Sequence, residues 1–161
     1  MTETPLHFKT ILELASMIES KTLSPVEVTE SALKRIGQQD LQYKSYATVM
    51  AEQARASAKA AEQAIASGNY LGPLHGVPIA VKDLCFTKGV PTMGATKALK
   101  THVPDFDCTV VRKLNDAGAV ILGKLNLTEG AMAGYNPEFQ VPVNPWGRSE
   151  EHTSELQSLV N

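Results

Sequence analysis

Two short apolar runs, each preceded by a helical pattern, limit what this chain can fold into. Val77, Ile79 and Val81 form the first run, and Ala119 to Leu122 form the second. Apolar residues that alternate or continue over four to six positions are typical of strands that are at least half buried. Because helical segments precede and separate these strands, the sequence predicts an α/β chain.

Four segments before residue 77 have helical or strand character. Apolar residues at helical spacing predict a helix from about Lys9 to Ser20, and alanine-rich spacing predicts another from Met50 to Ser67. Between them, Ser24-Pro-Val-Glu27 is typical of an N-cap, a first-turn proline and a capping-box glutamate, with Gly37 as the predicted stop. We expect a short strand over Tyr46 to Val49.

The segments beyond residue 82 continue the pattern. Asp107 is predicted to cap a helix with Val110, Val111 and Leu114 inward, and Gly118 is predicted to end it. The segment 86–101 is rich in turn formers and long enough to cover a site. After the second strand, Asn126 is predicted to cap a short helix that runs to about Ala133, with Glu129 in its first turn.

Composition excludes several classes of function. The chain has 161 residues, of which 43% are hydrophobic and 20% charged, as expected for about one globular domain. A net charge of −2 without basic clusters argues against binding nucleic acid. Apolar runs stay well short of the roughly 20 residues of a membrane span, and the N-terminus lacks a secretory pattern. We therefore expect a cytoplasmic protein without membrane contact.

Metal and nucleotide sites are not expected. Cys85 and Cys108 have no CxxC spacing, and the four histidines are isolated, so we predict free thiols, no metal and no cofactor. Gly118 to Lys124 fits most of a phosphate-binding loop. Its middle residues are apolar and Leu125 follows the lysine instead of Ser or Thr, which favours a buried strand end.

Lys82 stands at the end of the first apolar strand. A lysine there is more often a solvated surface residue, or a Schiff-base lysine in another chemistry, but lost hydration also lets it act as a base. Neighbours on a strand point to opposite faces, so Asp83 need not pair with Lys82 and is free to hold the following loop through backbone hydrogen bonds.

A series of motifs in one order adds to this interpretation. The pieces are Leu74-His-Gly-Val-Pro-Ile-Ala-Val-Lys-Asp83, Gly89-Val-Pro-Thr92, Asp116-Ala-Gly-Ala-Val-Ile-Leu-Gly-Lys-Leu-Asn126 and Asn144-Pro-Trp146. With them, residues 1–147 resemble the amidase signature family of amide-bond hydrolases. The resemblance implies the N-terminal part of that fold, a mixed β-sheet flanked by helices, which is incomplete here.

The resemblance also implies a mechanism. In the family, the lysine that corresponds to Lys82 is the general base and acid, and it works with two serines, one of them in a cis peptide geometry. Backbone N–H groups of a glycine-rich loop stabilise the oxyanion. The implied substrate is a small-molecule amide, no cofactor is needed, and a homo-oligomer is possible by the same resemblance.

Both serines would follow Trp146, where this sequence departs from the family. Residues 148–161 contain Ser149, Ser154 and Ser158 among glutamates, with no glycine to present N–H groups, so no catalytic role is transferred to them. The segment 148–158 also matches one reading frame of a common sequencing adapter, and we interpret 148–161 as an artefactual, non-family tail. We therefore expect this chain itself to be inactive.

Three functions stay open at this stage. The parent protein is expected to be an amidase that hydrolyses carboxamide C–N bonds. The alternatives are the glutamine-hydrolysing subunit of a tRNA-dependent amidotransferase and a non-catalytic fragment. Asn144-Pro-Trp146 after the segment 137–142 favours a stand-alone amidase modestly.

Overall fold

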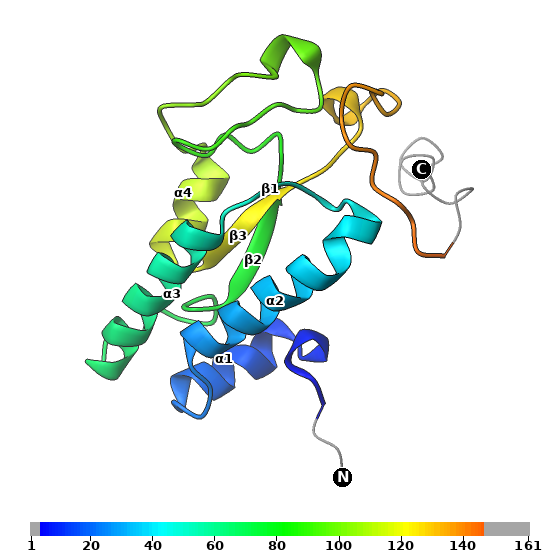
Figure 1. Ribbon diagram of the computed structural model, residues 1–161. Helices are drawn as coiled ribbons and strands as arrows, with labels where there is room; N and C mark the ends of the chain where they lie inside the picture. The colour runs from blue at the N-terminus through cyan, green and yellow to red at the C-terminus, as the bar shows by residue number, and fades with distance from the viewer. Residues whose placement is uncertain (1–3, 147–161) are drawn as a thin grey trace, which may run out of the picture.

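A mixed sheet of three strands lies at the centre of the structure (Figure 1). The computed structural model describes residues 4–146. The middle strand, β3 (Val120–Leu125), pairs antiparallel with β1 (Tyr46–Val49) and parallel with β2 (Pro78–Lys82). The predicted α/β class and the three predicted strands are confirmed.

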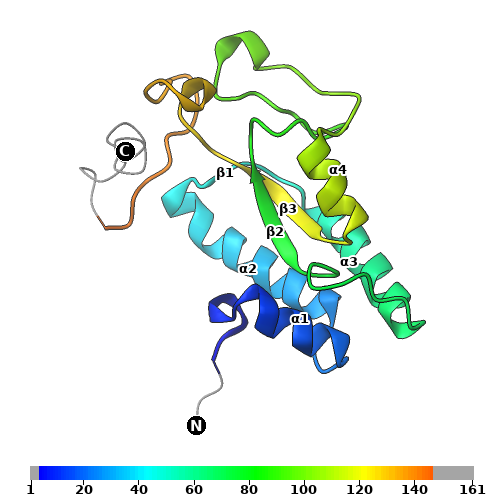
Figure 2. The same ribbon diagram turned by 180° about the vertical axis from the view of Figure 1, so that it is seen from behind.

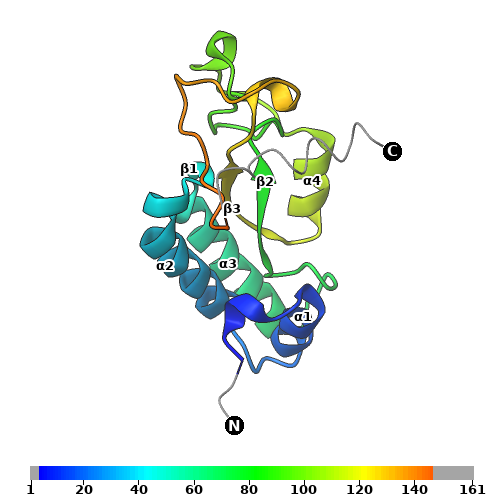
Figure 3. The ribbon, with the colours of Figure 1, turned by 90° about the vertical axis from the view of Figure 1, so that its right-hand side faces the viewer.

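Helices cover both faces of this sheet (Figure 3). Helices α2 (Pro25–Tyr43) and α3 (Ala51–Ala66) lie on one face, and α4 (Thr109–Asp116) lies on the other. Helix α1 (Ile11–Glu19) packs at the end of the sheet where β2 begins. Short 3-10 turns complete the described elements: η1 (Leu6–Phe8), η2 (Lys97–Leu99) and η3 (Glu129–Ala131).

Alternation along β3 divides the core into two layers. One layer joins side chains of α2, α3 and β3, namely Leu33, Ala54, Ala58, Val120 and Leu122. The other joins α4 to β2, β3 and the loop after β2, namely Met50, Val81, Val90, Val111 and Ile121. Successive strand residues point to opposite faces, so β3 is buried on both sides, as the continuous apolar run predicted.

Helix α2 is longer than its sequence pattern predicted. Ser24 caps it as expected, since its Oγ accepts the N–H groups of Val26 and Glu27. The predicted stop at Gly37 is wrong, because the helix continues to a left-handed Lys44 at φ 52°. A helical glycine costs about 1 kcal/mol relative to alanine, and burial of α2 against α3 and β3 outweighs that cost.

The capping box predicted for α2 occurs on α1 instead. The Thr10 hydroxyl accepts the N–H of Glu13, and the Glu13 carboxylate accepts the N–H of Thr10. This reciprocal pair satisfies two N–H groups that have no partner inside the helix.

Two helix starts predicted in the second half of the chain, at Asp107 and at Asn126, are wrong. Asp107 does not cap α4, because Cys108 is the N-cap and the Asp107 carboxylate accepts the backbone N–H of Lys88 and the side-chain amide of Asn115. Val110 is 54% exposed, so it does not face inward, whereas Val111 is fully buried. The Asp107 carboxylate thus joins the loop after β2 to the side chain of Asn115 near the end of α4 instead of capping the start of that helix.

Asn126 does not cap a helix either. Its side-chain amide donates to the carbonyl of Lys44, and Thr128 stands at the N-cap position of η3. The predicted helix from Asn126 to Ala133 is therefore reduced to the single turn Glu129–Ala131. Asn126 joins β3 to the end of α2.

In residues 4–146, no helix combines the length and the apolar character needed to cross a membrane. Cys85 and Cys108 are free, partly buried thiols, as predicted. The predicted tail 148–161 and its serines lie outside the described residues.

Candidate active site

Lys82 lies where the sequence placed it, at the carboxyl end of β2. Its side chain is exposed, and its Nζ donates to the carbonyl oxygen of Asn126 at 3.0 Å. The loop after β2 and the segment after β3 meet at this end of the sheet (Figure 1). Ligands of open α/β sheets bind outside the carboxyl ends of parallel strands. Lys82 therefore lies at a position where a ligand-binding or catalytic site is expected.

Asp83 holds the loop after β2, as the sequence predicted. Its N–H donates to the carbonyl of Leu125 at 2.9 Å, and its carbonyl accepts the N–H of Gly94 at 3.0 Å. Its Oδ2 accepts the N–H of Met93 at 3.0 Å. One residue therefore fastens the end of β2 to both β3 and the loop.

The sequence pattern missed the partner of that carboxylate. Lys124 of β3 is fully buried, and its Nζ lies 3.3 Å from Oδ1 of Asp83 and 2.7 Å from the hydroxyl of Thr92. Both Asp83 and Thr92 are only 1% exposed. The signal for this pair was a lysine at the end of a buried strand, together with an acidic residue just past the end of the parallel strand.

Burial acts on both charges of this pair. It raises the pKa of the Asp83 carboxyl, while the Met93 N–H and the Lys124 charge oppose that rise. It lowers the pKa of the Lys124 amine, while the Asp83 charge opposes that fall. Each charge is thus retained in the interior only because the other lies next to it.

A bulge in the sheet turns Lys124 towards Asp83. The pairing of β2 with β3 runs from Ile79 opposite Ile121 to Val81 opposite Lys124, so β3 has one extra residue there. That extra residue places Lys124 on the same face as Ile121 rather than on the face of Leu122. Strict alternation predicts the other face, which is why the ion pair could not be derived from the pattern.

Gly123 allows the strands to approach at this bulge. A Cβ on Gly123 would clash with the carbonyl oxygen of Thr48 on β1. Real Cβ atoms do not come that close to backbone oxygen, so this position accepts only glycine without a shift of β1.

The loop after β2 and the segment after β3 are tied to each other. The carbonyl of Gly94 accepts the N–H of Gly130, which links the loop after β2 to the segment after β3. The amine of Lys97 lies 2.9 Å from the Glu138 carboxylate, and Lys100 lies 3.7 Å from it. The predicted loop 86–101 is therefore joined to the segment after β3 beyond the carboxyl end of the sheet.

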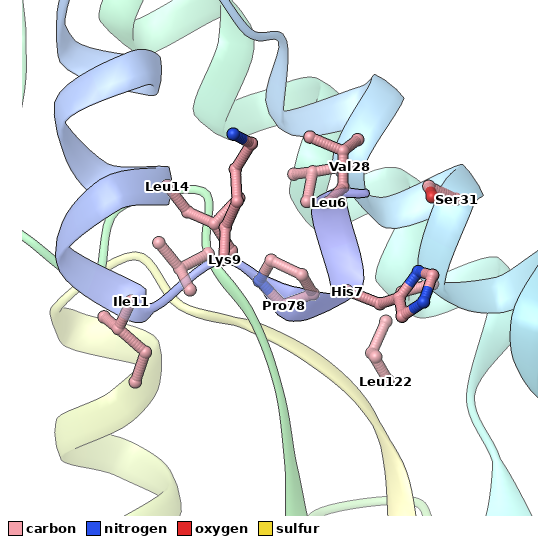
Figure 4. A pocket seen from close by; sticks show the side chains of 11 residues that line it. Leu6, His7, Lys9, Ile11, Leu14, Val28, Ser31, Pro78 and Leu122 are labelled. Atoms are coloured by element: carbon pink, nitrogen blue, oxygen red, sulfur yellow. The ribbon is translucent and has the colours of Figure 1, made fainter. Parts of the chain in front are cut away.

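One apolar cavity lies away from Lys82. It has a volume of about 240 Å³ and opens between η1, α1, α2 and the start of β2 (Figure 4). Leu6, Leu14, Val28 and Pro78 line it with apolar groups, and Lys82 does not take part. Within residues 4–146, no group of three or more His, Cys, Asp or Glu side chains is placed to bind a metal ion. The candidate site is the strand end at Lys82, where the loop after β2 and the segment after β3 meet.

Comparison with models of known protein families gives a match over most of this chain. The amidase family model matches residues 27–153. The chain belongs to the amidase family. This match confirms the resemblance to amidase signature enzymes that the motifs from residue 74 to residue 146 had indicated.

Similar proteins of this amidase family carry two kinds of name. AmiD of Mycobacterium tuberculosis, a protein with an amidase designation, is 53% identical over 136 residues. A glutamyl-tRNA(Gln) amidotransferase subunit of Geobacter metallireducens is 46% identical over 139 residues. These alignments cover 84% and 85% of this chain. The chain spans only 29% and 28% of the length of these curated relatives.

Solved amidase structures share the fold. A chain from a vestigial complex connected with the origins of an s-triazine catabolic enzyme has a TM-score of 0.81 and 34% identity, with 86% of this chain and 31% of that chain covered. The peptide amidase of Stenotrophomonas maltophilia has a TM-score of 0.73 and 30% identity, with 78% of this chain and 26% of that chain covered. The described residues therefore form part of the amidase signature fold, as predicted.

Proposed function

We propose that Lys82 is the general base and acid of an amide hydrolase to which this chain contributes the N-terminal part. The observation that carries the proposal is the environment of its amine. The neighbouring carboxylate of Asp83 is directed to Lys124, and Nζ of Lys82 contacts a backbone carbonyl instead. Among residues 4–146, no carboxylate forms an ion pair with this exposed amine, which leaves it open to a hydroxyl partner.

The proposed reaction is hydrolysis of a carboxamide. Lys82 accepts a proton through a bridging serine hydroxyl, and a second serine attacks the amide carbonyl carbon. The C–N bond then breaks, the proton passes to the leaving nitrogen, and water releases the acyl group as a carboxylic acid. Both serines are proposed to come from sequence that is present in the longer relatives and absent here.

A stand-alone amidase is the favoured parent. Identity to the AmiD protein is 53%, against 43–46% for the amidotransferase subunits. This difference agrees with the preference drawn from Asn144-Pro-Trp146. The second candidate is the glutamine-hydrolysing subunit, supported by 46% identity over 139 residues. In both cases the proposed substrate is a small amide.

A chimaera tests the proposal. Residues 4–146 of this chain replace the matching part of AmiD, and ammonia release is followed with simple aliphatic and aromatic amides. General-base catalysis contributes about 10² to 10⁴ in rate, so Lys82→Ala is expected to lower kcat by at least about 100-fold. Lys59→Ala, at an exposed lysine of α3, is the matched control and is expected to leave kcat unchanged. A Lys82→Ala chimaera that keeps the parental kcat would refute the role of Lys82.

A further inference from the structure

The buried pair Asp83–Lys124 has a geometry that stability alone does not require. Both side chains are at most 1% exposed, and they lie beside the apolar cluster of Val81, Val90 and Ile121. Apolar side chains of similar volume at such positions are often as stable as a buried ion pair. Unlike apolar packing, an ion pair is directional, because it holds two particular atoms at a fixed distance from each other.

The atoms fixed here lie next to Lys82. Asp83 follows Lys82 in the chain, and its N–H, carbonyl and carboxylate bind β3 and the loop at Met93 and Gly94. The amine of Lys82 contacts β3 as well, at the carbonyl of Asn126. The position of that amine therefore depends on how the ends of β2 and β3 are held together.

A direct catalytic role for Lys124 is excluded by access. Its Nζ lies 2.7 Å from the hydroxyl of Thr92, which is the arrangement of an activated nucleophile. The lysine is 0% exposed and the threonine 1% exposed, so no substrate reaches either group. Thr92 instead accepts a hydrogen bond from the buried ammonium group.

We infer that Lys124 and Asp83 are positioning residues that fix the backbone from which Lys82 projects. This inference rests on the proposed role of Lys82. The pair ties the end of β2, the end of β3 and the loop at residues 92–94 into one unit, and Lys82 is the exposed side chain of that unit.

Amide hydrogen exchange in the full 161-residue chain tests whether the ion pair holds the ends of β2 and β3 to the loop at residues 92–94. Removal of the ammonium group by Lys124→Met is expected to speed exchange of the Met93, Gly94 and Asp83 amides together, while amides of α2 and α3 keep their protection. The control Lys59→Met removes an exposed lysine of α3 and is expected to change none of these rates. Unchanged protection at Met93 and Gly94 in Lys124→Met would overturn the inference.

Kinetics of the chimaera separate positioning from stability. Asp83→Asn and Lys124→Met each leave one buried polar group without its partner, and both are expected to lower the unfolding temperature. The double variant buries no charge and is expected to recover that temperature. Its kcat is still expected to be about 100-fold low with an unchanged KM, because a catalytic group displaced by about 1 Å costs about that factor.

The outcomes distinguish the two proposals. Recovery of both the unfolding temperature and kcat in the double variant would make the pair a stability element only. A Lys82→Ala chimaera with full kcat would instead refute the proposed function, whatever the exchange rates show. Thr92→Val, which keeps the ion pair and removes the hydroxyl, is expected to lower kcat less than Lys124→Met.

Discussion

The carboxylate of Asp83 lies 3.3 Å from the amine of Lys124, although Lys82 is its neighbour in the chain. Strand geometry explains the choice, because adjacent side chains on a strand point to opposite faces and the bulge in β3 turns Lys124 to the face of Asp83. The two lysines thereby acquire opposite environments: Lys82 is exposed at the strand end, and Lys124 is enclosed.

The first prediction concerns activity of the chain as it stands. Purified residues 1–161 are expected to release no ammonia from simple amides above a Lys82→Ala control. A nucleophile, its base and its oxyanion donors act as a unit, and loss of the nucleophile alone costs on the order of a million-fold in rate. Turnover that exceeds this control would mean that a serine of this chain is competent.

The second prediction concerns two glycines with opposite surroundings. Gly123→Ala is expected to destabilise the fold by about 1–3 kcal/mol, since its Cβ would clash with the Thr48 carbonyl oxygen. Gly37→Ala in α2 meets nothing within 4 Å and is expected to stabilise the fold by about 0.5–1 kcal/mol. Urea unfolding of both variants measures the difference. Equal effects of the two substitutions would contradict the close approach of β1 to β3.

The third prediction concerns pH. His75 is 3% exposed, its Nδ1 accepts the N–H of Leu71, and burial lowers its pKa below 6.5. As pH falls through about 6.5 the unfolded chain binds a proton that the folded chain does not, so stability is expected to fall below that pH. Urea unfolding at pH 7.5 and 5.5 measures this slope.

His75→Asn serves as its control. The asparagine oxygen can accept the same N–H but does not titrate, so the fall in stability between pH 7.5 and 5.5 is expected to shrink. A variant that loses as much stability as the parent over this interval would show that another group is responsible.

The fourth prediction concerns the edges of the sheet. Strands β1 and β2 are the outer strands of the described sheet, and β2 has no strand on its outer side in the described residues (Figure 2). Unpaired strand edges are templates for association, so the chain is expected to self-associate as its concentration rises. Size-exclusion chromatography and thermal unfolding at several concentrations test this. A single monomer peak with a concentration-independent transition would contradict it.

Local sequence patterns predicted which helices and strands occur better than they predicted the residues at which these helices and strands begin and end. The apolar positions 77, 79 and 81 gave strand β2 and placed Lys82 at its end, because a period of two residues is a property of the strand itself. The helix stop at Gly37 and the cap at Asp107 were wrong, since burial of α2 and the loop contacts of Asp107 are tertiary effects. Lys124 was the largest omission. A lysine at the end of an apolar run is expected at the surface, and only the bulge and the distant Asp83 make its burial possible.

The left-handed turn at Lys44, which ends α2, presents two backbone carbonyls to later parts of the chain. The carbonyl of Tyr43 accepts the N–H of Val143, and the carbonyl of Lys44 accepts the side chain of Asn126, whose own carbonyl holds Lys82. The last described segment is therefore linked, through the end of α2 and the side chain of Asn126, to the carbonyl that accepts from Lys82. Loss of the Asn126 side-chain amide would therefore weaken the link between the end of α2 and the strand end that carries Lys82.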